Sequence, residues 1–141
     1  MACILIIDDN EDIRRLLRRM LESDAHEVME AGDGAEGLKR IAVRKPDLVI
    51  TDIFMPEKDG LEILREIRKT HPGMNVIAIS GGGQLGNMDI LRMARSFGAF
   101  CVMAKPFSLR EMLQTVNAAL ASPHSEYGEL GNEDAPAYPD R

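Results

Sequence analysis

The sequence predicts an α/β fold, a doubly wound five-stranded parallel sheet with strand order 2-1-3-4-5. Five short apolar runs, each about as long as a strand, alternate with segments whose apolar residues recur at helical spacing. Such alternation is typical of a parallel sheet that helices cover on both faces. Right-handed crossovers then leave few strand orders, and 2-1-3-4-5 is the commonest of them at a length of 141 residues.

The first two strand–helix units carry clear start and stop signals. Residues 3–7 and 27–31 read as strands. The segment between them reads as a helix, because its apolar residues share one face and its arginines the other. Asp33 can cap a second helix, which a Lys-Pro pair ends near Arg44. In the first helix the apolar residues are Ile13, Leu16, Leu17, Met20 and Leu21, and the arginines are Arg14, Arg15, Arg18 and Arg19.

The third and fourth units follow the same plan. Residues 48–51 and 76–79 read as strands, and a helix between them stops near the sequence His-Pro-Gly at 71–73. A glycine-rich stretch, GGGQLGN at residues 81–87, leads into the fourth helix. The apolar positions of the third helix are Leu61, Ile63, Leu64 and Ile67, and those of the fourth are Ile90, Leu91, Met93, Ala94 and Phe97.

The fifth unit completes a domain that we assign to residues 1–121. Gly98 can stop the fourth helix, residues 100–104 read as the fifth strand, and Ser108 can cap a last helix. From residue 122 the pattern stops. Residues 122–141 contain five acids, one arginine and three prolines, and so supply −4 of the net charge of −6. We expect this acidic, proline-containing tail to be disordered.

Composition excludes several classes of protein. A net charge of −6 argues against a nucleic-acid-binding surface. No apolar stretch approaches the roughly 20 residues of a membrane span. The start, MACILIIDDNED, lacks the basic region and cleavage site of a signal peptide. We therefore expect a cytoplasmic protein without a membrane or nucleic-acid partner, in which Cys3 and Cys101 are reduced, buried thiols.

Polar residues stand where four of the five predicted strands end. Asp8 and Asp9 follow the first strand, Asp52 the third, Ser80 the fourth and Lys105 the fifth. In this strand order the four ends lie side by side at one edge of the sheet, where ligands of such folds bind. We therefore expect three carboxylates, a hydroxyl and an ammonium group to converge.

This set of groups suits a divalent cation and a phosphoryl group. Three neighbouring carboxylates repel one another, and one lysine offsets only part of their charge. Oxygen ligands from few protein groups are typical of Mg²⁺, which completes its shell with water and phosphoryl oxygens. A carboxylate that faces the phosphoryl group can attack it as a nucleophile and form an acyl phosphate. Positioning and charge neutralisation would then supply most of the catalysis.

Four motifs in order resemble one family. ILIIDDN, TDIFMPEKDG, AIS and AKPF are similar to the receiver domain of two-component response regulators, the chemotaxis-regulator (CheY-like) type, over roughly residues 1–121. The resemblance implies a flavodoxin-like fold. It also implies that Asp52 accepts a phosphoryl group from a phosphohistidine on a sensor histidine kinase or a histidine phosphotransfer protein, in a reaction that depends on Mg²⁺.

The resemblance further implies a role for each site residue. Asp9 would bind Mg²⁺ directly, Asp8 mostly through water, and the main-chain carbonyl of Phe54 would add a ligand beside Asp52. Lys105 would pair with the phosphoryl oxygens. The Ser80 hydroxyl would hydrogen-bond the phosphoryl group and act as a switch. The peptide bond between Lys105 and the following proline is often cis in this family.

Two positions depart from the family pattern. Receivers commonly place Tyr or Phe three residues before the lysine as a rotating switch, and here Val102 stands there, short and stiff. We expect Phe100 on the same strand face, but too far from the site to replace it. The interval from Ser80 to Lys105 is also about three residues longer than usual. We hypothesise that ordering of residues 81–87 carries the signal instead.

The output of the protein is less constrained than its chemistry. No output domain follows residue 121, so we expect a single-domain regulator that signals by phosphorylation-dependent contact with an unidentified protein. Two alternatives are a receiver fragment of a longer regulator and a Mg²⁺-dependent phosphatase with an aspartyl phosphate intermediate. Phosphatases of that kind place a second acid two residues after the nucleophile, where this chain has Phe54. We therefore expect that the protein is not an enzyme for other substrates and catalyses only its own phosphorylation and dephosphorylation.

The four arginines of the first helix fit a solvated face or a docking surface equally well.

Overall fold

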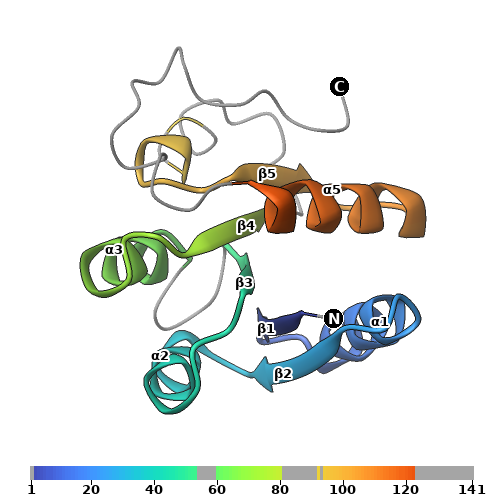
Figure 1. Cartoon of the computed structure of the whole chain (residues 1–141), viewed down its shortest axis with the longest axis horizontal. Helices are drawn as coiled ribbons and strands as arrows, with labels where there is room; N and C mark the ends of the chain where they lie inside the picture. Colours follow the sequence, from blue (N-terminus) through green and yellow to red (C-terminus); the bar gives the residue numbers. More distant parts are fainter. Residues whose placement is uncertain (1, 54–59, 81–91, 93, 123–141) are drawn as a thin grey trace.

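A computed structural model describes residues 2–53, 60–80, 92 and 94–122. Five parallel strands form one sheet in the order β2-β1-β3-β4-β5, as the sequence predicts (Figure 1). The strands are β1 Cys3–Ile7, β2 Glu27–Ala31, β3 Leu48–Asp52, β4 Asn75–Ser80 and β5 Cys101–Ala104. The helices are α1 Glu11–Glu22, α2 Gly34–Val43, α3 Gly60–Thr70 and α5 Leu109–Ala121.

Two apolar layers flank the sheet, which is why its strands read as nearly continuous apolar runs. In Figure 1, α1 and α5 cover one face and α2 and α3 the other. Alternate residues of each central strand point into one layer or the other: Ile4 and Ile6 pack with α1 and α5, whereas Leu5 and Ile7 pack with α2 and α3. The sheet is thereby fixed in register, since a slip of one residue would exchange the two faces.

Side-chain caps set where the helices begin. Asp33 accepts a hydrogen bond from the Glu36 amide at 2.8 Å, which confirms the predicted cap of α2. Ser108 and Glu111 form a reciprocal capping box at the start of α5. Asn10 caps α1, which was not predicted; its side-chain oxygen accepts from two backbone amides, at 2.9 and 3.2 Å.

Gly98 ends the helical residues 92 and 94–96, as predicted, and two features require a glycine there. Its φ of 97° lies in the left-handed region. A Cβ at this position would also collide with the Arg68 guanidinium. That guanidinium donates to the main-chain carbonyl of Gly98 at 2.9 Å. The rest of the predicted fourth helix lies outside the described residues.

One expectation about the fifth strand is wrong. β5 begins at Cys101, so Phe100 lies before the strand, and the alternation of strand faces does not extend back to it. Phe100 packs in the layer of α1 and α5, whereas Val102 packs in the layer of α2 and α3. Phe100 therefore does not share a face with Val102.

Three smaller expectations can also be compared with the structure. The Lys105–Pro106 peptide bond is cis. Cys3 and Cys101 are free and buried. Of the predicted tail, residues 123–141 lie outside the described part of the chain. In the described part, the longest helix, α5, has 13 residues, and none of the helices has the length and apolar character to cross a bilayer.

Candidate functional site

The carboxyl ends of β1, β3, β4 and β5 meet at one edge of the sheet. Asp52 is the last residue of β3 and pairs in register with Ile79, the residue before Ser80. The backbone N–H of Lys105 donates to the carbonyl of Ser80 at 2.8 Å, so the end of β5 is fixed beside the end of β4. The parallel register therefore brings together four segments that are far apart in the sequence.

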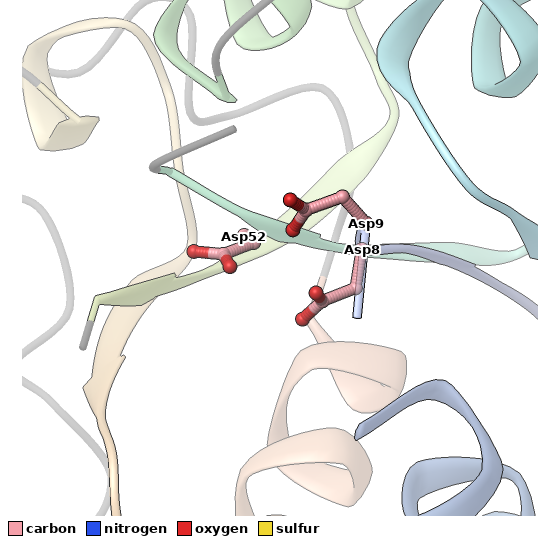
Figure 2. A group of neighbouring side chains, drawn as sticks. All are labelled: Asp8, Asp9 and Asp52. Atoms are coloured by element: carbon pink, nitrogen blue, oxygen red, sulfur yellow. The ribbon is translucent and has the colours of Figure 1, made fainter. Parts of the chain in front are cut away.

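Three aspartates and one lysine converge at this edge. Asp8, Asp9 and Asp52 each offer a carboxylate oxygen, and these oxygens all lie within 4.8 Å of one another. Figure 2 shows the two side chains that follow β1 close to the Asp52 side chain at the end of β3. The Lys105 Nζ lies 3.4 Å from Oδ2 of Asp52 and 3.8 Å from Oδ2 of Asp8. The predicted convergence of these four residues is therefore present.

Asp8 is the most deeply buried member of this group, in which Asp52 is also buried and Asp9 is exposed. Its side chain is 1% exposed. Its Oδ1 accepts a hydrogen bond from the Asn10 amide at 2.9 Å, whereas its buried Oδ2 has no hydrogen-bond partner among the described residues. Burial raises the pKa of Asp8 from an ordinary value of 3.8 to about 6. The Asn10 amide and the Lys105 charge lower this pKa, and the charges of Asp52 and Asp9 raise it.

The charge of the group is incomplete without a cation. Three ionised carboxylates and one ammonium sum to −2 at this edge. A buried carboxylate oxygen without a hydrogen-bond donor is costly, and structures retain one where another ligand completes the site. Oxygen donors on three carboxylates are the ligands that Mg²⁺ prefers. The orphaned Oδ2 of Asp8 and the donor set therefore fit the expected magnesium ion.

A tight turn after β1 places the two adjacent aspartates differently. The Asp8 amide continues the β1–β2 ladder by donating to the Ala31 carbonyl at 3.1 Å, so this side chain remains buried beside the strands. Asp9 lies one residue further, beyond the ladder, and is exposed. Asn10 then starts α1. An asparagine directly before a helical pattern with Glu11 and Asp12 in its first turn is a cap signal that sequence reasoning could have used.

Of the remaining predicted site residues, the structure describes Ser80 and Val102 but not Phe54 or residues 81–87. Ser80 is 2% exposed at the end of β4. Val102 is half-buried in β5 and pairs in register with Ala78. Phe54 and the glycine-rich residues 81–87 lie outside the described residues, so a carbonyl ligand and a loop-ordering switch stay predictions.

The four arginines of α1 differ in exposure, and whether the exposed ones form a docking surface stays a prediction. Arg15 and Arg19 are exposed. Arg14 and Arg18 are only partly exposed, and both make ion pairs with Glu30 of β2, at 3.1 and 2.5 Å. Arg14 also donates through Nη1 to the main-chain carbonyl of Asp8 at 2.7 Å. Sequence reasoning missed this contact, because the helical pattern does not indicate which arginine reaches the end of β1.

Comparison with known proteins gives a consistent set of relatives. The family model described as the response regulator receiver domain matches residues 4–117. Response regulator MprA of Mycobacterium ulcerans (strain Agy99) is 33% identical over 138 residues, which cover 97% of this chain and 58% of that protein. The chain thus spans little more than half the length of this curated relative.

Two solved structures match most of the chain. The crystal structure of a response regulator receiver domain protein from Clostridium thermocellum is 37% identical, with a TM-score of 0.78, over 85% of this chain and 94% of that one. A CheY-like response regulator receiver domain protein from Methanospirillum hungatei JF-1 is 30% identical, also with a TM-score of 0.78, over 93% of this chain and 99% of that one.

Proposed function

The chain belongs to the response regulator receiver domain family, and we propose that Asp52 accepts a phosphoryl group from a phosphohistidine in a Mg²⁺-dependent reaction. One observation carries this proposal. Three carboxylate oxygens lie within 4.8 Å of one another, the lysine ammonium lies 3.4 Å from Asp52, and the group retains a charge of −2. This arrangement supports a site for one divalent cation and one phosphoryl group.

Each residue of the site would have a separate role in the phosphoryl transfer. Asp9 and Asp52 would hold the magnesium ion directly, Asp8 mostly through water, and the main-chain carbonyl of Phe54 would add a ligand; the ion would supply positive charge to neutralise the phosphoryl oxygens. An Asp52 carboxylate oxygen attacks phosphorus; an O–P bond forms, the N–P bond of phosphohistidine breaks, and the leaving imidazole takes a proton from solvent. Lys105 attracts the transferred oxygens.

Ser80 would report the new phosphoryl group, whereas Val102 stands at the second switch position without the usual aromatic side chain. The Ser80 hydroxyl, at the end of the strand beside Asp52, hydrogen-bonds the phosphoryl oxygens once they are present. Val102 occupies the position of the switch aromatic and packs in the layer of α2 and α3. Because valine has no ring to rotate, the response at β5 is small, and the change at Ser80 has to be transmitted by other residues.

We propose that the donor is a sensor histidine kinase or a histidine phosphotransfer protein in the cytoplasm, and that the phosphorylated domain signals by contact with a second protein. A single-domain regulator and the receiver part of a longer regulator both fit. The second possibility is kept because the relative MprA is longer than this chain. A phosphatase acting on other substrates is disfavoured, because Phe54 stands where such enzymes place their second acid. The chain would catalyse only its own phosphorylation and dephosphorylation.

Intact-mass measurement after incubation with acetyl phosphate and MgCl₂ tests the chemistry. We expect the wild-type chain to gain the mass of one phosphoryl group, and the gain to vanish in Asp52→Asn and in samples with excess EDTA. Glu62→Gln, a substitution at an exposed position in the first turn of α3, serves as the matched control and is expected to be phosphorylated like the wild type. Equal phosphorylation of wild type and Asp52→Asn would refute the assignment of the acceptor.

A further inference from the structure

Arg14 connects three elements of the fold at the edge of the candidate site. Its Nε pairs with Oε1 of Glu30 on β2 at 3.1 Å, and its Nη1 donates to the main-chain carbonyl of Asp8 at 2.7 Å. The two side chains are only 18% and 28% exposed, so water competes weakly for these contacts. A single guanidinium therefore links α1, β2 and the residue that follows β1.

A hydrogen bond to the Asp8 carbonyl restricts the backbone of both Asp8 and Asp9. This carbonyl and the Asp9 amide belong to one planar peptide unit, so fixing the oxygen fixes the plane. The Asp8 amide is already held by Ala31 at 3.1 Å. With the peptide units on both sides fixed, the backbone sets the directions in which the Asp8 and Asp9 side chains leave the chain.

The geometry requires an arginine that is itself held in place. A guanidinium presents several donors in a rigid fork and can serve a carboxylate and a carbonyl at once, which an ammonium group on a flexible stem does poorly. The second oxygen of Glu30 is occupied by Arg18 at 2.5 Å. Arg18 in turn reaches Glu22 at 2.9 Å, so Glu30 is a fixed anchor against which Arg14 is oriented.

We propose that Arg14 is a positioning residue for the Mg²⁺ site, which acts through the Asp8 carbonyl and is oriented by Glu30. It touches neither the phosphoryl group nor the ion; it holds the peptide unit that aims two of the three carboxylates. This inference rests on the proposed function, because it assigns Arg14 a role in that site.

Substitution of Arg14 separates positioning from electrostatics, because the two effects have opposite signs. Removal of a positive charge near the site should strengthen Mg²⁺ binding by simple attraction. Loss of the constraint on Asp8 should weaken it, and outer contacts of this kind typically contribute about 10-fold in metal affinity. We expect Arg14→Gln to bind Mg²⁺ about 10-fold more weakly than wild type in isothermal titration calorimetry.

Arg15→Gln is the matched control. Arg15 neighbours Arg14 in the same helix, but it is exposed and pairs with Glu11 and Asp12, so its loss leaves the contacts of Arg14 with Glu30 and with the Asp8 carbonyl in place. We expect its Mg²⁺ affinity to stay within about twofold of wild type. The Mg²⁺ concentration that gives half-maximal phosphorylation by acetyl phosphate should rise in Arg14→Gln and not in Arg15→Gln.

Glu30→Gln supplies a second test if Arg14→Gln does not fold by circular dichroism. It leaves Arg14 in place but removes its charged anchor, and should weaken Mg²⁺ binding by a smaller factor than Arg14→Gln. Equal or tighter Mg²⁺ binding by Arg14→Gln, or by Glu30→Gln when only that variant folds, would overturn the role of Arg14. A wild-type chain that binds no Mg²⁺ would instead overturn the proposed function itself.

Discussion

Asp8 and Glu30 lie on either side of Arg14 and have opposite electrostatic environments. Glu30 is partly exposed and accepts hydrogen bonds from two arginines. Burial raises its pKa, but the hydrogen bonds and charges of Arg18 and Arg14 outweigh burial, and its pKa is lowered. Asp8 is buried, leaves Oδ2 without a hydrogen-bond donor among the described residues, and has a pKa raised to about 6.

The comparison shows that the charge of Glu30 stabilises the folded protein, whereas the charge of Asp8 destabilises it. The charge of Glu30 is compensated within the protein, because each of its two carboxylate oxygens pairs with an arginine. Asp8 has a lysine at 3.8 Å, but the same lysine lies closer to Asp52, at 3.4 Å, and two other carboxylates are near Asp8. Its charge is therefore unfavourable until a ligand arrives, which is typical of binding sites and atypical of structural ion pairs.

The largest expected effect is stabilisation by Mg²⁺. A ligand that binds only the folded state at 100 times its dissociation constant raises the free energy of unfolding by about 2.7 kcal/mol. Urea unfolding with saturating MgCl₂, against NaCl of equal ionic strength, measures the gain. We expect most of it to disappear in Asp9→Asn and to persist in Glu30→Gln at high enough Mg²⁺ concentration. Equal stability in the two salts would mean that the acidic group does not bind the ion.

The next effect is a gain of stability when Asp8 loses its charge. Because its folded pKa of about 6 exceeds the ordinary 3.8, the folded state binds more protons than the unfolded state between these values. The penalty is therefore complete above pH 6 and fades as pH falls towards 4. Without Mg²⁺, Asp8→Asn should be more stable than wild type by about 2 kcal/mol at pH 7.5.

Urea unfolding with EDTA at pH 7.5 and pH 4 measures this difference, and the gap between the two proteins should close at the lower pH. Asp24→Asn, on the exposed turn after α1, is a suitable control because its carboxyl lies outside the acidic group. An Asp8→Asn protein that is less stable than wild type at pH 7.5 would place Asp8 among the stabilising carboxylates.

Glu30 should show the opposite sign. Its lowered pKa means that its contribution is present above the ordinary value of 4.5 and is lost as pH falls through the folded pKa. Glu30→Gln should reduce the free energy of unfolding by about 1 kcal/mol at neutral pH, discounted for partial exposure. Unfolding curves at pH 7 and pH 3.5 should show that the loss shrinks in acid. A loss that grows in acid would contradict the assignment.

The smallest effect is expected on the outer face of α1. Arg15 pairs with Glu11 at 3.2 Å, and both side chains are more than half exposed. Such pairs contribute roughly 0.3–0.5 kcal/mol, so Arg15→Gln should lower stability by no more than that and leave Mg²⁺ affinity unchanged. Calorimetric unfolding and titration of the same sample check both statements, and a large change in either would show that this face belongs to the site.

Much of the site was predictable, because in a parallel sheet of known strand order the place of a residue along its strand fixes where it lies in space. Residues that end parallel strands must meet at one edge, so Asp8, Asp52 and Lys105 could be brought together from apolar runs alone. The assignment of a residue to one face of the sheet, by contrast, holds only within a strand, because the alternation of side chains ends with the strand. For that reason the face occupied by Phe100 was predicted wrongly.

Side-chain contacts between elements were not predictable. The pattern of α1 assigns Arg14 and Arg18 to a polar face, but whether they reach β2 depends on the distance and angle at which the helix packs. The division of burial between Asp8 and Asp9 likewise depends on the turn made by Asn10, and adjacent identical residues give no sequence signal for it.

A carbon-detected NMR titration of the side-chain carboxyls in the metal-free protein compares Asp8 with Glu30 in one sample. We expect Asp8 to have a pKa of about 6, Glu30 to have a pKa below its ordinary value of 4.5, and the pKa of Asp8 to fall when Mg²⁺ is added. A pKa of Asp8 at or below 3.8 without Mg²⁺ would refute the proposed cation site, because the charge of Asp8 would then already be compensated within the protein.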